Sequence, residues 1–321
     1  MPLIVRTTGH VNCSMLRYIL RRLLLVLPVF FGVSIIIFII MHSAPGDPVL
    51  NLIGESPNAA EEYQRIMHSL GLDQPLYVQY LTFLQRFFQG DLGRSIITHE
   101  RVWGEILARF PRTIILTVAA MGLAIGIAIP AGVVSATRQY SIVDNLSMTV
   151  AIFGISMPSF WLGVVLIYIF SFRLGLTPMS GIGGVEHLIL PAITLGALSA
   201  GMLARLTRSS MLEVLRQDYV RTARSKGLSG RVVVYKHVLR NAMIPVTTTI
   251  GQRFGHLLGG SMITETVFGY PGLGSLLVRA ASQYDYPVVQ GVLLITTLVT
   301  VLVFLVVDIL YAYFDPRVSY E

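Results

Sequence analysis

The chain contains 321 residues, of which 54% are hydrophobic and only 13% are charged, and its formal net charge is +7 at pH 7. Soluble domains average roughly 25% charged residues, so this composition excludes an ordinary soluble domain and indicates a membrane protein. The single cysteine, Cys13, excludes an intrachain disulfide and a cysteine-rich metal site.

Six stretches are apolar enough and long enough to cross a bilayer, which takes about 20 residues. In chain order they are residues 23–41, 114–136, 146–172, 188–206, 244–263 and 288–313. Prolines inside them are compatible with helices, because neighbouring helices in a membrane protein satisfy the backbone groups that proline frees. The sequence therefore predicts an all-α membrane protein with six transmembrane helices.

The N-terminal region is expected to divide into an extension, residues 1–14, and a first transmembrane helix within residues 15–42. A cleaved signal peptide is disfavoured, because the first apolar run has the length of a span and no small-x-small cleavage pattern follows it. Residues 43–108 form an insert in which 61–70 and 78–88 show helical spacing, so we expect a small helical cap. The core then covers residues 109–313, and residues 314–321 form a tail.

The distribution of Lys and Arg predicts the orientation. Basic residues collect before the first span and after the second, fourth and sixth spans. Short cytoplasmic loops hold such an excess, so both termini are predicted in the cytoplasm and the insert outside. Because the positive charge follows membrane topology and forms no soluble basic face, nucleic-acid binding is disfavoured.

The loop after the fourth span, residues 207–243, is the most basic part of the chain: from Arg205 to Arg240 there are nine Lys and Arg against two acidic residues. Helical spacing places one stripe of apolar side chains in its first half, at Leu212, Leu215, Tyr219 and Ala223. Gly227 is predicted to end this helix, and Ser229 to cap a second one that runs toward Leu239. The loop is thus expected to be two helices joined by a bend that glycine adopts at little cost.

Polar residues inside the spans are few. Arg253 lies near the middle of the fifth span, between Gln252 and His256, and an arginine there must face the bundle interior or a wet cavity. Either it lines a translocation cavity, or helix carbonyls or an acidic partner hold it. The glycines of this span recur at four-residue spacing and permit close approach of a second helix; they are Gly251, Gly255, Gly259 and Gly260.

Two further features concern the third and sixth spans. Met157, Pro158 and Ser159 are expected to kink and widen the third span, with packing as the simpler role of its Met and aromatic side chains. Asp308, near the inner end of the sixth span, is expected to pair with Arg205 or Arg208.

Enzymatic motifs are absent from the sequence. It has no GxxxxGK[ST] phosphate loop, no HExxH and no CxxC, so ATP binding and metal chemistry are not expected on this chain. We predict no catalytic residue, no metal site and no cofactor.

The basic loop resembles the coupling region of the inner-membrane permeases of binding-protein-dependent ABC importers, in the peptide, nickel and glutathione branch that includes dipeptide and oligopeptide permease B-like subunits. Arg221-Thr222-Ala223, three residues and Gly227 stand where that family has Glu-Ala-Ala, three residues and Gly. His237 and Arg240 depart from the closing motif of the family. The sequences of segments 218–227 and 239–245 nevertheless match those typical of the peptide branch.

Two outer segments also resemble this family. Pro45-Gly46-Asp47-Pro48 and Gly90-Asp91-Leu92-Gly93 match signatures of the branch, although turn chemistry alone explains them as well. The run from Val267 to Gly274 is similar to the family's re-entrant turn between the last two spans, with an ordinary surface loop as the alternative.

The resemblance implies a type I ABC importer permease fold in a bacterial inner membrane. It implies as partners a second homologous permease subunit, two ATPase subunits that hold ATP and Mg²⁺, an extracytoplasmic substrate-binding protein and the lipid bilayer. Short peptides or glutathione are the favoured cargo, with nickel chelates as the alternative. The alternative from another class of protein is a secondary transporter driven by an ion gradient. Such a transporter requires a relay of intramembrane carboxylates.

The resemblance also assigns roles to residues. ATPase coupling is expected at Asp218, Tyr219, Arg221, Thr222, Ala223, Arg224, Lys226 and Gly227. The translocation pathway is expected at Arg253, His256, Gln252, Met157 and Ser159. An extracytoplasmic gate that contacts the binding protein is expected at Tyr270, Pro271, Gly272, Gly274 and Asp47.

Overall fold

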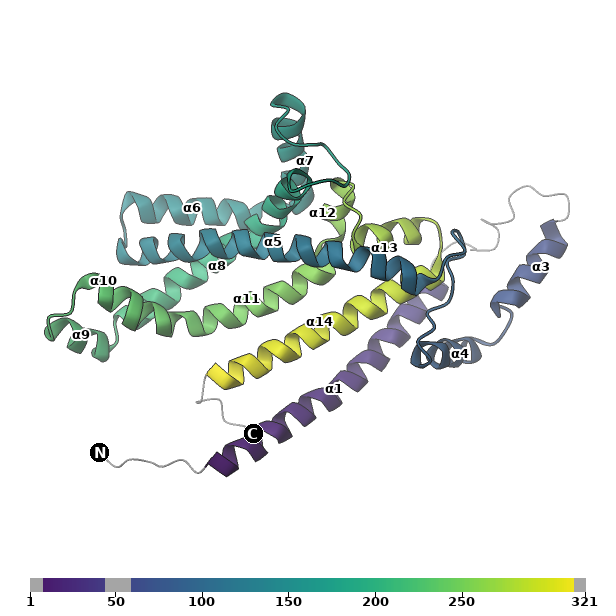
Figure 1. The fold of residues 1–321 in the computed structure, drawn as a ribbon, viewed down its shortest axis with the longest axis horizontal. Helices are drawn as coiled ribbons and strands as arrows, with labels where there is room; N and C mark the ends of the chain where they lie inside the picture. Colours follow the sequence, from purple (N-terminus) through teal and green to yellow (C-terminus); the bar gives the residue numbers. More distant parts are fainter. Residues whose placement is uncertain (1–7, 44–58, 315–321) are drawn as a thin grey trace.

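The computed structural model describes residues 8–43 and 59–314, and within these residues the regular elements are helices. Five long helices run side by side along the molecule (Figure 1). They are α1 (Thr8–Ser43), α5 (Val102–Thr137), α8 (Glu186–Leu215), α11 (Arg240–Gly260) and α14 (Tyr286–Phe314). The first of them begins inside the segment predicted as an N-terminal extension. The prediction of an all-α membrane fold is confirmed.

The two ends of the molecule carry different elements. The start of α1 and the end of α14 lie at the same end as α9 (Asp218–Ser225) and α10 (Gly230–Val232) (Figure 1). The opposite end carries α3 (Ala59–Leu70), α4 (Leu76–Phe88) and α13 (Leu273–Ser282). The basic loop and the insert are therefore at opposite ends of the bundle, as a membrane topology with the two on opposite sides requires.

Within the described residues, four helices are long and apolar enough to cross a membrane: Leu23–Ser43, Val102–Thr137, Glu186–Leu215 and Tyr286–Ile309. They cover the predicted first, second, fourth and sixth spans. The predicted fifth span corresponds to α11, which has 21 residues but carries Gln252, Arg253 and His256 and is not among the four. The number of six spans stays a prediction.

The predicted kink in the third span, residues 146–172, is confirmed, and it breaks the segment into two helical parts. The segment consists of α6 (Ile142–Ser156) and of α7 (Ser159–Leu166) continued by the π-helix η1 (Ile167–Arg173), and the two parts meet at 104°. Pro158 removes a backbone donor at the break, and Met157 and Pro158 have extended backbone, so the chain changes direction there. The α7–η1 arm consequently projects from the bundle (Figure 1).

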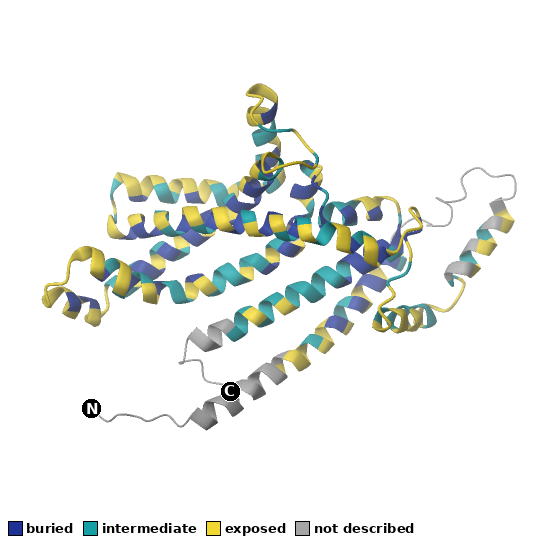
Figure 2. Cartoon of the chain, in the orientation of Figure 1, coloured by how far each residue is buried: buried dark blue, intermediate teal, exposed yellow. Residues whose placement is uncertain are grey.

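Buried apolar residues gather where α8 packs against α5, α6 and α11, and a further cluster lies where α1, α5, α13 and α14 meet (Figure 2). Small residues permit this close approach: a Cβ on Gly196 of α8 would lie 2.8 Å from the carbonyl oxygen of Ala120 on α5. The glycines of α11 serve the same purpose, because Gly251 faces Val307 and Gly255 faces Phe304 of α14. The predicted close approach of a second helix to this glycine face is confirmed.

The insert contains two helices at the predicted places, α3 and α4. Between them His68 Nδ1 lies 2.8 Å from Asp73 Oδ2, and this hydrogen bond lowers the pKa of the exposed Asp73 carboxyl below its ordinary value. The Gly90–Gly93 segment forms a turn in which the Gly93 amide donates to Asp91 Oδ1 at 2.9 Å. The other predicted turn, Pro45 to Pro48 with Asp47, lies outside the described residues.

Candidate functional site

The basic loop folds as a short helix docked on the ends of α5 and α8. Helix α9 buries only Val220 and Ala223, which pack in a cluster with Val133 of α5 and Met211 of α8. The predicted single helix through 212–223 is wrong, because α8 ends at Leu215 and α9 begins anew at Asp218. This restart turns the helix, so that Val220 is buried and the Tyr219 side chain is exposed.

The bend at Gly227 is confirmed. Its φ is +76°, in the left-handed region that disfavours residues with a Cβ, and a Cβ at this position would meet no atom within 4 Å. The backbone conformation, and not a lack of space, therefore requires glycine. The predicted side-chain cap at Ser229 is not formed, and the second helix starts instead with the Val233 amide donating to the Ser229 carbonyl at 3.0 Å.

The outward face of α9 and its C-terminal end is polar and mostly basic. With Ala223 buried, the other coupling residues predicted from the sequence are all exposed: Asp218, Tyr219, Arg221, Thr222, Arg224, Lys226 and Gly227. The face is fixed to α11, because Asn241 Nδ2 donates to the Tyr219 hydroxyl at 3.0 Å. A partner that pressed on this face would therefore push on α5, α8 and α11 together.

An ion pair near the same end was not foreseen. Arg208 of α8 donates from Nε and Nη2 to Asp144 at the start of α6, at 2.7 and 2.8 Å. The buried Asp144 carboxylate also accepts bonds from the Ser135 hydroxyl and from the Tyr140 amide. The predicted pairing of Asp308 with Arg208 is wrong, because Arg208 is bound to Asp144. The only sequence signal was local: Ser141 caps α6 through the Asp144 amide, the Ser-x-x-Asp spacing of a helix start.

At the opposite end, the predicted re-entrant run forms a tight hairpin between α12 (Met262–Val267) and α13. At its base lies Glu265, which is 0% exposed and accepts hydrogen bonds from Thr113 Oγ1 (2.9 Å), Ser261 Oγ (2.8 Å) and the Ser275 amide (3.0 Å). Gly272, the residue just before α13, has no side chain that could cap the helix, so Glu265 and Thr113 cap it from other elements. Sequence reasoning missed Glu265, whose signal was a single acid between the predicted fifth span and the run from Val267 to Gly274.

The glycines of the hairpin have two different physical reasons. Gly269 has a φ of +56° and makes the turn, whereas Gly272 and Gly274 leave room for the Glu265 carboxylate and the Met262 backbone. Tyr270 is buried, and its hydroxyl donates to the Arg112 carbonyl oxygen at 3.2 Å. In this structure Tyr270 therefore anchors the hairpin to α5, whereas Pro271 and Gly274 stay partly exposed.

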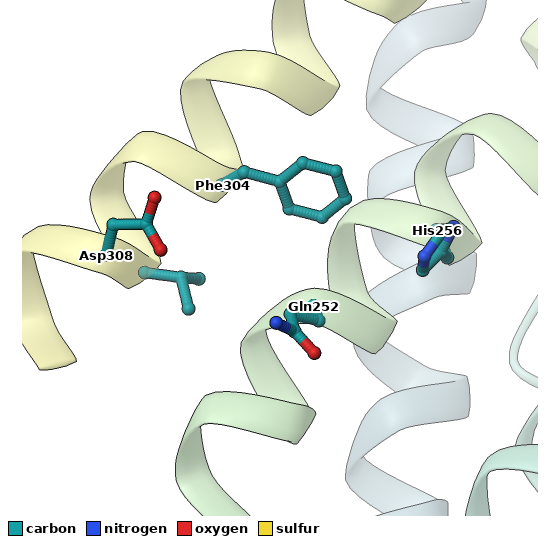
Figure 3. A pocket seen from close by; sticks show the side chains of 5 residues that line it. Gln252, His256, Phe304 and Asp308 are labelled. Atoms are coloured by element: carbon teal, nitrogen blue, oxygen red, sulfur yellow. The ribbon is translucent and has the colours of Figure 1, made fainter. Parts of the chain in front are cut away.

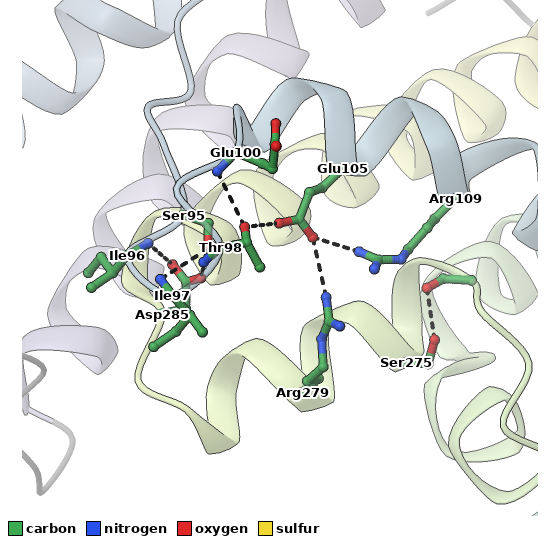
Figure 4. Close-up of polar contacts among 11 residues, drawn as sticks. Ser95, Ile96, Ile97, Thr98, Glu100, Glu105, Arg109, Ser275, Arg279 and Asp285 are labelled. Atoms are coloured by element: carbon green, nitrogen blue, oxygen red, sulfur yellow. Dashed lines mark hydrogen bonds and ion pairs between the residues drawn. The ribbon is translucent and has the colours of Figure 1, made fainter. Parts of the chain in front are cut away.

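A polar cluster joins the hairpin to the insert (Figure 4). Glu105 of α5 accepts bonds from Arg109 (2.7 Å), Arg279 of α13 (3.3 Å) and the Thr98 hydroxyl (2.7 Å). Beside it the buried Asp285, just before α14, accepts bonds from the Ser95 hydroxyl and from the Ile96 amide at 3.1 Å. The segment that follows the Gly90–Gly93 turn is thereby tied to the start of α5, the end of α13 and the start of α14.

The predicted pathway residues do not all come together. Gln252 and His256 of α11 line a cavity of about 440 Å³ with Phe304, Val307 and Asp308 of α14 (Figure 3). Arg253 instead contacts the Met202 sulfur of α8. Met157 and Ser159 lie at the break between α6 and α7 and are not among the residues that line this cavity. Among the described residues no group of His, Cys, Asp and Glu is suited to hold a metal ion.

These features describe a multi-pass membrane protein with a docked basic helix at one end and an ordered hairpin at the other. Residues 128–320 match the family described as binding-protein-dependent transport system inner membrane component, and residues 15–117 match the description of its N-terminal part. The chain belongs to this family of inner-membrane transport components.

The similar curated proteins include the Di/tripeptide transport system permease protein DppB of Pseudomonas aeruginosa (strain UCBPP-PA14), which is 46% identical over 96% of this chain and 100% of its own length. The Glutathione transport system permease protein GsiC of Escherichia coli (strain K12) is 45% identical over the same shares of the two chains. Among solved structures, the inward-facing MetNI methionine ABC transporter superposes with a TM-score of 0.57 at 19% identity, over 66% of this chain and 96% of that one. This last likeness supports the type I permease fold alone.

Proposed function

We propose that this chain is one of two permease subunits of an ATP-driven importer for short peptides or glutathione, with both termini in the cytoplasm. The observation that carries the proposal is α9: a basic face held on the bundle by Val220 and Ala223, bent at Gly227, and placed at the end where α1 starts and α14 ends. The di/tripeptide and glutathione permeases, each matched over its full length, support the cargo class.

The coupling role follows from what α9 contacts. Two separate ATPase subunits, which would hold ATP and Mg²⁺, receive α9 and close on it when they bind nucleotide. Because α9 packs on α5 and α8 and is bonded to α11 through Tyr219, a displacement of α9 moves these three helices together.

The outer hairpin is proposed to face an extracytoplasmic substrate-binding protein. Glu265, Thr113 and Tyr270 hold its backbone from below, so that Pro271 and its neighbours form a fixed surface before the binding protein arrives. A fixed surface loses less conformational entropy on docking than a loop that must order.

We propose that Arg253, on one face of α11, and Gln252 and His256, on the adjacent face, recognise the cargo within the membrane. Every peptide and glutathione carries at least one carboxylate, and a thioether such as Met202 is a weak acceptor that leaves the other guanidinium donors of Arg253 available. Replacing Arg253 with Gln should reduce uptake of cargo with a free carboxylate more than uptake of amidated analogues. Equal loss for both kinds of cargo would reject the carboxylate role.

The proposal is tested by reconstituting the chain with its second permease, both ATPases and the binding protein in proteoliposomes. We expect peptide or glutathione accumulation only when ATP and the ATPases are present. Accumulation driven by a proton or sodium gradient without the ATPases would assign the chain to the secondary-transporter class. Thermal stabilisation of the cognate binding protein by peptides, glutathione and nickel chelates then identifies the cargo.

A further inference from the structure

Helix α4 has a wider apolar surface than its neighbours cover. One side of it packs against α1 through Tyr80 and Phe87: the Phe30 and Phe87 rings lie 5.0 Å apart, and the Ser34 and Tyr80 hydroxyls 2.9 Å apart. At about 100° per residue, the apolar arc continues around the helix from this side to Tyr77, Leu81 and Phe88. These three side chains form a second stripe next to the packed one.

The second stripe is open. Tyr77 is 69% exposed, Leu81 60% and Phe88 64%. Thr82, Gln85 and Arg86 occupy the remaining side of the helix. Helix α4 is therefore amphipathic, and its apolar face is wider than its contact with α1. A helix with one wide apolar face and one polar face is suited to contact lipid through its apolar face.

The position of α4 beside α1 places this stripe near lipid. The two helices run antiparallel: His42 Nε2 contacts Gln79 Oε1 at 2.9 Å near one end, and the Phe31 and Phe88 rings lie 6.4 Å apart near the other. Phe31 is twelve residues before the end of the apolar segment Leu23–Ser43, which corresponds to about 18 Å along the helix. Helix α4 therefore accompanies the outer part of a membrane-spanning helix and does not stand above the bilayer.

The exposed side chains of α1 continue the surface. Ile35, Ile36, Ile39 and Ile40 are exposed on a segment apolar enough to cross the membrane, so acyl chains are their natural environment. The open stripe of α4 adjoins this lipid-facing segment.

We propose that α4 lies along α1 within the outer leaflet of the bilayer, with Tyr77, Leu81 and Phe88 among lipid acyl chains and with Gln85 and Arg86 on the opposite, water-accessible face. This changes the expectation from the sequence, in which the whole of residues 43–108 formed a cap outside the bilayer. Helix α4 then holds the insert at the membrane beside α1 through noncovalent contacts with lipid. The inference concerns the placement of α4 and is independent of the cargo.

The test uses the fact that Cys13 is the only cysteine. In a Cys13→Ser background, single cysteines replace Leu81 or Phe88, and Gln85→Cys is the matched control from the polar face of the same helix. Each variant carries an environment-sensitive fluorophore in the assembled transporter, reconstituted in proteoliposomes. Quenching is measured with nitroxide-labelled phospholipid and with aqueous iodide.

We expect the labels at 81 and 88 to emit at shorter wavelength, to be quenched severalfold more by nitroxide lipid than the label at 85, and to be protected from iodide. Iodide quenching at 81 and 88 equal to that at 85 would place the stripe in water and overturn the proposal. Protection from both quenchers would show that another protein covers the stripe, which overturns it as well. Uptake by each labelled complex confirms that the variants are assembled.

Discussion

Glu265 of α12 and Thr113 of α5 share a hydrogen bond of 2.9 Å in a place where both side chains are buried. The Thr113 hydroxyl also accepts the Leu273 amide at 2.8 Å, so one threonine joins the carboxylate to the first turn of α13. The pair thus connects a span to the hairpin that we propose faces the binding protein.

The first prediction concerns this pair. Thr113→Val should destabilise the protein by about 1–3 kcal/mol, because it leaves the Leu273 amide without its acceptor and removes one of the two hydrogen bonds to Glu265 Oε1. The matched control is Thr117→Val on the same helix, whose buried hydroxyl has no partner among the described atoms, and this change should be neutral or stabilising. Thermal unfolding of the purified complex measures both effects.

Measurements of ATPase activity distinguish a positioning role of Glu265 from a merely structural one. Glu265→Ala should lower the stimulation of ATPase activity by loaded binding protein more than it lowers basal ATPase activity, and Glu265→Gln should restore part of the stimulation because its amide oxygen still accepts hydrogen bonds. Normal stimulation in Glu265→Ala would refute the positioning role.

The second prediction concerns Asp144 and Arg208. Removing one partner of a buried ion pair typically costs about 3–5 kcal/mol, and the partial exposure of Arg208 places the expected loss at the lower end of that range. Asp144→Ala and Arg208→Ala should each lower the unfolding temperature, and the double variant should be less destabilised than the sum of the two. Additive losses in the double-mutant cycle would show that the pair contributes no coupling energy.

The third prediction concerns the bend at Gly227. Gly227→Val should leave the permease inserted and assembled but abolish uptake, with ATPase activity uncoupled or lost, because a β-branched residue disfavours a φ of +76°. Gly230→Ala is the matched control, since Gly230 is three residues away, has no positive φ and has open space for a Cβ. Full transport by Gly227→Val would contradict the coupling proposal.

The fourth prediction concerns the contact of α11 with α14. Gly255→Ala should cost about 1–3 kcal/mol, because the new Cβ would lie 2.5 Å from the Phe304 ring and the packed helices must separate. Gly122→Ala on α5, where a Cβ meets no atom within 4 Å, should instead stabilise its helix by up to about 1 kcal/mol. Unfolding temperatures of the two variants should therefore move in opposite directions.

Local patterns were sufficient for several elements. Four of the predicted spans coincide with long apolar helices, since length and composition alone decide whether a segment can cross a bilayer. The bend at Gly227 and the helix-approach face of Gly251 and Gly255 were likewise readable, because each depends on residues within a few positions of one another.

What only the tertiary structure decided involves residues far apart in the chain. Thr113 and Glu265 are 152 positions apart and Asp144 and Arg208 are 64 apart, so no local pattern pairs them. The same holds for the direction of Arg253, which faces Met202 while its neighbour Gln252 faces the cavity with Asp308. Periodicity states which side chains share a face of a helix, but the partner of that face is set by how the helices pack, and packing is a property of the whole bundle.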